Sequence, residues 1–122
     1  MDPLRLSTRT VNGHALVGVG GEIDLATAPE LCAHVAGVLD TGVTRVTLDL
    51  GGVTFMDASG LTALLVLRRH ALGTGATLHL AALPRQVRLI LRVTGLDACF
   101  AVPPQSGSAD GDLARRSAVA DL

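Results

Sequence analysis

The feature that most constrains the fold is the alternation of strand-like and helix-like hydrophobic patterns along the chain. After an opening hairpin, segments with alternating apolar residues are followed by segments in which apolar residues recur every three or four positions. Successive strand–helix–strand units join parallel strands by right-handed crossovers. The pattern therefore predicts an α/β fold: a mixed, mostly parallel sheet of four to five strands with an N-terminal hairpin, packed with three to four helices.

The hairpin is indicated by Asn12-Gly13, the strongest short hairpin signal, between strand-like segments that together span residues 4–20. The later elements are assigned from the period of their apolar residues. The glycine-containing segment 51–58 is expected to break the strand before it. Strands are expected at 43–50, 76–83 and 97–102, and helices within 24–42, at 59–73 and at 84–95.

The composition is that of one folded domain with an aliphatic core. The chain has 122 residues, of which 48% are hydrophobic, and Phe55 and Phe100 are its only aromatic residues. It therefore lacks the stacking platforms with which proteins usually bind single-stranded nucleic acid. From Pro103 onward the residues are small, polar and at first rich in Pro and Gly. We expect one domain over 1–102 and a disordered tail over 103–122.

Charge and hydropathy exclude several classes of function. The formal net charge is −1 and no basic stripe stands out, which argues against nucleic-acid binding. The apolar stretches are far shorter than the ~20 residues of a membrane span, and the N-terminus lacks a signal-peptide core, so we expect a cytoplasmic protein. Cys32 and Cys99 are expected to be buried free thiols. His, Cys and carboxylate residues do not cluster, so no metal or cofactor is expected.

The segment TFMDASGL, residues 54–61, places Asp57 and Ser59 where a parallel strand is expected to lead into a helix. Either residue can cap that helix. The carboxyl end of a parallel strand is also where sites gather in α/β proteins, and the amides at a helix start favour anions. Gly60 removes bulk beside the Ser59 hydroxyl, so that another molecule can approach it.

Other chemistries fit these residues poorly. Ser59 lacks the glycine two positions before it that a nucleophile elbow carries, and no histidine is an evident base for it. The segment GVGGEI, 18–23, does not complete a dinucleotide-binding fingerprint, and no phosphate-binding P-loop is present. We therefore expect no enzyme activity.

A second segment, GEIDLATAPEL over 21–31, follows the return strand of the hairpin. Thr27 and Glu30 have the spacing of a capping box at the start of a helix. In a parallel sheet this loop leaves the same edge as the Ser59 corner. Glu22 and Asp24 are therefore expected near Asp57, framing one hydroxyl with carboxylates.

These two segments, together with LPRQVRLILRVTGLDACFAV over 83–102, resemble the STAS-domain anti-sigma factor antagonists of bacteria. The resemblance covers about residues 4–102 and implies a STAS-like single domain. In that family the serine beside the glycine, here Ser59, is phosphorylated by an anti-sigma factor that is a serine kinase of the histidine-kinase-like ATPase fold. The unphosphorylated antagonist binds this partner and releases the sigma factor. A PP2C-type phosphatase restores the serine.

The resemblance also implies which residues meet the partner. Many family members carry a second serine at position 58, where this chain has alanine, so Ser59 is the one hydroxyl at the corner. The partner-binding residues expected on this basis are Asp24, Thr27, Asp57, Ala58, Gly60 and Leu61.

Two other functions remain open from the sequence. The first is a STAS interaction module without a switch, in a larger complex of the stressosome or lipid-transport accessory type, in which Ser59 only caps its helix. The second is a small enzyme that uses Ser59 as nucleophile. Phosphorylation of Ser59 by a partner kinase is the property that distinguishes the switch from both.

Overall fold

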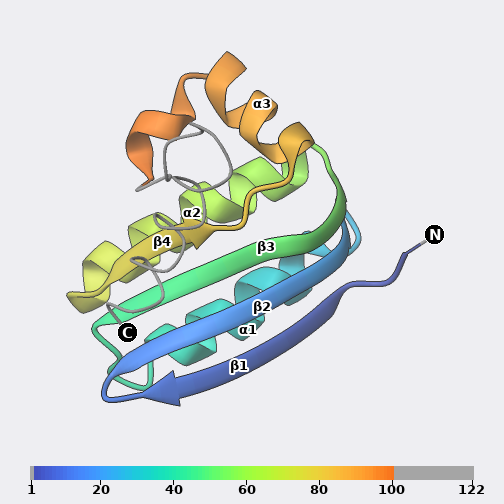
Figure 1. Cartoon of the computed structure of the whole chain (residues 1–122). Coiled ribbons are helices and arrows are strands. Elements are labelled where there is room, and N and C mark those ends of the chain that lie inside the picture. The colour runs from blue at the N-terminus through green and yellow to red at the C-terminus, as the bar shows by residue number, and fades with distance from the viewer. Residues whose placement is uncertain (1, 101–122) are drawn as a thin grey trace, which may run out of the picture.

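The computed structural model describes residues 2–100, which form a four-stranded sheet in the order β1-β2-β3-β4 (Figure 1). Strands β1 and β2 pair antiparallel, and β2, β3 and β4 are parallel. The predicted α/β fold is therefore confirmed. The elements are β1 (Arg5–Val11), β2 (His14–Ile23), α1 (Ala28–Leu39), β3 (Arg45–Met56), α2 (Ala58–Thr74), β4 (Thr77–Ala81), α3 (Arg85–Val93) and the 3-10 helix η1 (Leu96–Cys99).

The hairpin forms at the predicted place. Asn12 and Gly13 have φ angles of 52° and 79°, and Val11 pairs directly with His14 across the turn. Two successive residues with positive φ match the right-handed twist of a two-residue hairpin. Asn and Gly are the residues that adopt this conformation most readily, so the sequence dictates the turn.

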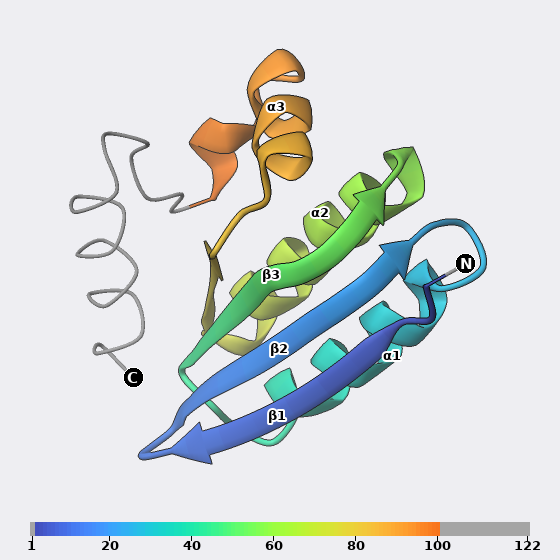
Figure 2. The ribbon, with the colours of Figure 1, turned by 45° about the vertical axis from the view of Figure 1, so that its right-hand side comes forward.

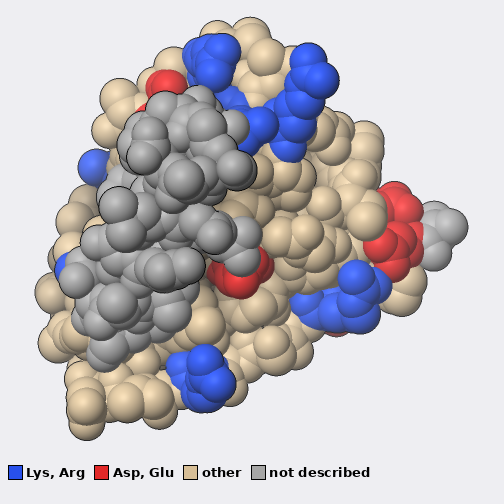
Figure 3. All heavy atoms as spheres, in the orientation of Figure 1, with Lys and Arg blue, Asp and Glu red and all other residues tan. Residues whose placement is uncertain are grey.

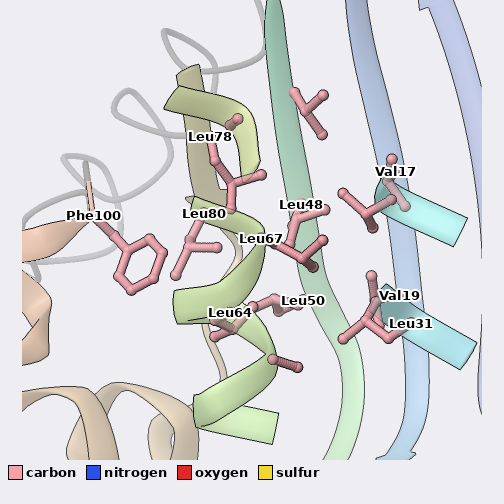
Figure 4. Close-up of a cluster of buried hydrophobic side chains, with 14 of the residues drawn as sticks. Val17, Val19, Leu31, Leu48, Leu50, Leu64, Leu67, Leu78, Leu80 and Phe100 are labelled. Atoms are coloured by element: carbon pink, nitrogen blue, oxygen red, sulfur yellow. The ribbon is translucent and has the colours of Figure 1, made fainter. Parts of the chain in front are cut away.

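Helices α1 and α2 pack on the same face of the sheet (Figures 1 and 2). Val17, Leu48 and Leu80 lie side by side in register across β2, β3 and β4, and all three are fully buried. Leu31 of α1 and Leu67 of α2 are buried in the same cluster (Figure 4). The core is aliphatic apart from Phe100, as the scarcity of aromatic residues predicted.

Two boundaries differ from the predictions. Strand β3 does not end at residue 50 but continues to Met56. Gly52 pairs with Gly20 of β2, and a Cβ on Gly52 would lie 3.1 Å from the Gly20 Cα, so the glycines keep the two strands together through a register shift. The longer strand carries the chain to the edge of the sheet where α2 begins.

The predicted strand over 97–102 is also wrong. Gly95 adopts a left-handed φ of 74° and turns the chain into η1, and Phe100 follows as a buried anchor beside Leu80 (Figure 4). A short apolar segment without clear hydrophobic periodicity is compatible with a buried turn as well as with a strand. Positions 101 and 102 and the predicted tail over 103–122 lie outside the described residues.

Cys32 and Cys99 are both free thiols, as predicted, although each is only half-buried. No helix in the described part of the chain has the length and hydropathy that a bilayer crossing requires.

Candidate functional site

The two sequence segments singled out above meet at one edge of the sheet. Ile23, the last residue of β2, pairs with Met56, the last residue of β3. The Asp57 amide donates a hydrogen bond of 3.2 Å to the Ile23 carbonyl oxygen. The loop that leads into α1 and the corner that leads into α2 are therefore held together, as the parallel arrangement predicted.

Asp57 is the N-cap of α2. Its Oδ1 accepts a hydrogen bond of 2.8 Å from the Ser59 amide, and its carbonyl oxygen accepts from the amides of Gly60 and Leu61. A capping carboxylate also suits the positive end of the helix dipole. Of the two possible caps, Asp57 is the one that the fold uses, and the Ser59 side chain is not needed for this purpose.

Ser59 is half-buried at the second position of α2. No hydrogen bond within residues 2–100 engages its hydroxyl. Its neighbour Ala58 is exposed. The corner thus presents one hydroxyl on a helix start whose backbone is already fixed by another residue.

Gly60 is buried, and its role differs from the one suggested by the sequence. A Cβ at this position would lie 2.5 Å from the Cγ of Met56 and 2.9 Å from the Cγ2 of Ile23. The glycine allows α2 to rest directly on the ends of β2 and β3. Leu61 is half-buried and packs against the core. These two residues of the expected partner-binding set therefore lie toward the interior of the free protein.

The loop before α1 is tied by its own side chains. Asp24 Oδ1 accepts from the amides of Ala26 and Thr27, and the Thr27 hydroxyl donates to the Glu22 carbonyl oxygen at 2.9 Å. The predicted capping box is wrong, because Thr27 makes no side-chain cap bond to the helix and its hydroxyl instead turns back to the loop. Leu25, at 78% relative exposure, lies between these tied residues.

A groove of about 390 Å³ separates the starts of α1 and α2, and Ser59 lies on its wall. Its lining is mostly apolar: Leu25, Ala28, Pro29, Cys32, Ser59, Thr62, Ala63 and Val66. Burial raises the pKa of the Cys32 thiol, so this group is neutral near pH 7. The groove is a surface suited to apolar side chains of another protein, with the hydroxyl-bearing residues Ser59 and Thr62 beside them.

Sequence reasoning identified Ser59 but not the rest of this groove. Leu25, Pro29, Thr62 and Val66 were not singled out. One signal was available, since the helix over 59–73 reads as apolar nearly all round, and a helix with only one buried face then leaves apolar residues such as Val66 exposed. Which helix lies opposite that face follows only from the packing.

Among the described residues, no base is hydrogen-bonded to the Ser59 hydroxyl. Of the histidines, His34 contacts the Thr8 hydroxyl and His70 contacts the Asp40 carboxylate, and no hydrogen bond within residues 2–100 joins a histidine to Ser59. No group of three or more His, Cys, Asp or Glu side chains within that range is placed to bind a metal ion.

The fold and the corner define a class of protein. The model of the family described as "Mlab, STAS domain" matches residues 6–103, and the chain belongs to this family. Among its relatives is the anti-sigma-F factor antagonist RsfB of Mycobacterium tuberculosis, which is 29% identical over 99 residues, covering 81% of this chain and 80% of RsfB. The resemblance inferred from the two motifs is therefore confirmed.

Solved structures agree. The crystal structure of an anti-sigma factor antagonist from Mycobacterium paratuberculosis superposes with a TM-score of 0.76 at 29% identity, covering 94% of this chain and 96% of that one. The Bacillus cell fate determinant SpoIIAA in its phosphorylated form has a TM-score of 0.64 at 18% identity, with coverage of 93% and 100%. At that identity, the second similarity supports the fold alone.

Proposed function

We propose that this protein is an anti-sigma factor antagonist whose binding is switched off by phosphorylation of Ser59. The observation that carries the proposal is the unengaged Ser59 hydroxyl on the wall of an apolar groove, on a helix capped by another residue. The names of the relatives support the same role. In this role the unphosphorylated protein binds an anti-sigma factor in the cytoplasm, and the sigma factor is released.

The chain itself needs no catalytic group for such a switch. The partner, a serine kinase, transfers the γ-phosphoryl group of ATP to the Ser59 Oγ. A P–Oγ bond forms, the bond between the β- and γ-phosphates breaks, and the serine proton passes to a base of the kinase while ADP leaves. A PP2C-type phosphatase hydrolyses the product and restores the hydroxyl.

The local charges explain why a phosphate opposes binding. A phosphoserine adds roughly −1.5 to −2 charges. The Asp57 carboxylate already accepts the hydrogen bond of the Ser59 amide, and the Asp24 carboxylate lies in the neighbouring loop, so a phosphate on Ser59 adds negative charge near two carboxylates. In the complex the phosphate must also lose water against a mostly apolar groove. Moving a complex from mostly bound to mostly free takes on the order of 5 kcal/mol of differential affinity.

The expected interface follows from this geometry. Asp24 and Thr27 lie in the loop before α1, Asp57 and Ala58 lie at the start of α2, and these are the two helices that line the groove. Leu25 adds an exposed apolar side chain to the groove lining. Gly60 and Leu61 contribute by holding the corner in place. We propose these residues as the partner-binding set on that basis.

Paired variants test the switch. Ser59→Ala is expected to bind the cognate anti-sigma factor constitutively, because the hydroxyl makes no bond that the fold needs. Ser59→Asp is expected to bind on the order of 100-fold more weakly, since it leaves an unpaired charge in the interface. Isothermal titration with the purified partner measures both. Ser7→Asp, an exposed serine on β1, is the matched control and is expected to bind like the wild type.

Equal affinities of the two Ser59 variants would rule the switch out and favour the interaction module without a switch, which uses the same groove. Incubation with ATP and the partner kinase separates the two directly. A mass increase of about 80 Da on the Ser59 peptide, the mass of one phosphoryl group, supports the switch. Unchanged mass with an intact complex supports the module.

A further inference from the structure

Helix α3 has a basic face that the linear sequence did not make evident. Arg85, Arg88 and Arg92 are spaced by three and four residues and therefore share one side of the helix. Val87 and Leu91 are buried on the other side and anchor α3 to the core. Figure 3 shows one group of blue side chains at the top of the molecule, where Figure 1 places α3, and other blue side chains elsewhere on this face. The helix is held by its apolar residues, while Arg85 and Arg92 are exposed and Arg88 is half-buried.

Within the described part of the chain these arginines have no counter-charge. No ion pair or hydrogen bond among residues 2–100 engages the guanidinium group of Arg85, Arg88 or Arg92. Like charges three or four residues apart on a helix repel one another. Residues 2–100 thus offer these guanidinium groups no ionic partner, and only Arg92, in the last turn of α3, has a favourable position relative to the helix dipole.

Exposed apolar side chains border the stripe. Leu89 has 54% and Val93 76% relative exposure, and at a period of 3.6 residues both follow directly beside the arginines around the helix. The exposed surface of α3 therefore combines a row of guanidinium groups with an adjacent row of aliphatic side chains. It differs from the α1–α2 groove, which is apolar and carries no arginine.

We propose that this surface, formed by Arg85, Arg88, Leu89, Arg92 and Val93 and here termed the α3 face, docks an acidic segment of another protein. The matching segment is amphipathic, with carboxylates three or four residues apart beside one or two aliphatic side chains. Guanidinium groups bind carboxylates through two parallel hydrogen bonds, which gives such a pairing both strength and register. Leu89 and Val93 bury their apolar surface against the aliphatic row.

The chemistry of the α3 face favours a protein segment over the other anionic partners. A helix of 9 residues with two exposed aliphatic side chains offers little area to insert into a lipid surface. The chain has two aromatic residues and a formal net charge of −1, which does not suit a nucleic-acid backbone.

Nuclear magnetic resonance on the full chain tests the proposal. The probe is a synthetic 15-residue peptide, about four helical turns, with Glu at every third or fourth position and Leu between. It is expected to shift the amide resonances of residues 85–93 in a saturable way that weakens with added salt. Arg88→Gln is expected to raise the dissociation constant on the order of fivefold, as loss of one paired charge does. Arg69→Gln, which removes an exposed arginine of α2, is the charge-matched control and is expected to change it less than about twofold.

Three further titrations distinguish binding of an acidic peptide from binding of other ligands. A peptide with Gln in place of every Glu is expected not to bind. This control separates recognition of the carboxylates from non-specific hydrophobic binding. Vesicles of anionic phospholipid and a short DNA duplex are titrated in parallel. The proposal is overturned if the acidic peptide shifts no α3 resonance, if Arg69→Gln weakens binding as much as Arg88→Gln, or if vesicles or DNA shift α3 while the peptide does not.

Discussion

At Gly60 the backbone of α2 approaches two strand ends so closely that no side chain fits. The atoms nearest to where a Cβ would lie belong to Met56 and Ile23, which are themselves fully buried at the edge of the sheet. A single hydrogen atom in place of a methyl group thus sets the distance between helix and sheet. The position of the Ser59 hydroxyl, one residue earlier, depends on that distance.

Gly60→Ala is therefore expected to destabilise the protein by about 1–3 kcal/mol, the usual cost of overpacking a tight core. Gly37→Ala is the matched control, because Gly37 lies in α1 and a Cβ there would meet no atom within 4 Å apart from its chain neighbours and the backbone of its own helix. At that position the same substitution is expected to stabilise by about 0.5–1 kcal/mol, since alanine loses less backbone entropy in a helix. Urea unfolding measures both, and effects of the same sign would contradict the packing role of Gly60.

At the scale of the element, the segment before β1 ties two strands together near the site. The Glu22 amide donates to the Asp2 carbonyl oxygen, and the Asp2 carboxylate accepts from Arg5 at 2.7 Å and from Thr54 at 2.9 Å. The hydrogen bond from Arg5, followed by that from Thr54, lowers the pKa of Asp2. The segment therefore holds the ends of β2 and β3 through a group that titrates in acid.

The pKa of Asp2 is lower in the folded protein than in the unfolded chain. The ionised carboxylate therefore stabilises the fold at pH values above 3.8, the ordinary pKa of this group. That contribution is lost as the pH falls through the lowered pKa. Asp2→Asn is expected to reduce the melting temperature at pH 7, with a smaller difference from the wild type in strong acid. Thermal unfolding followed by circular dichroism at several pH values checks this, and a difference that stays constant down to acid pH would contradict it.

The α1–α2 groove is the other element-level feature, and Leu25 is its most exposed apolar residue. If the groove receives the partner, burial of Leu25 contributes to affinity, and Leu25→Ala is expected to weaken binding about tenfold. Leu72→Ala is the control, because Leu72 is 58% exposed on α2 but does not line the groove. Titration with the purified partner compares the two variants. Equal losses would place the interface elsewhere.

At the scale of the whole molecule, hydrophobic periodicity was enough to predict the order of the elements and the parallel sheet. The meeting of the Ser59 corner with the Asp24 loop followed from that topology. The groove did not, because the rotation of α1 against α2 is decided by which side chains interlock. The end of β3 and the 3-10 helix were missed for a local reason: Gly52 and Gly95 act through a close approach and a left-handed turn, which composition alone does not reveal.

The capping of α2 by Asp57 also affects whether one molecule can be modified at Ser59 repeatedly without losing its fold. Every described bond that starts α2 belongs to Asp57 or to the main chain, and none belongs to the Ser59 hydroxyl. A group on which the fold does not depend can gain and lose a substituent without loosening its neighbours. If Ser59 is phosphorylated as we propose, one polypeptide can pass through many signalling cycles, and resetting the response needs a hydrolysis step and no new protein synthesis.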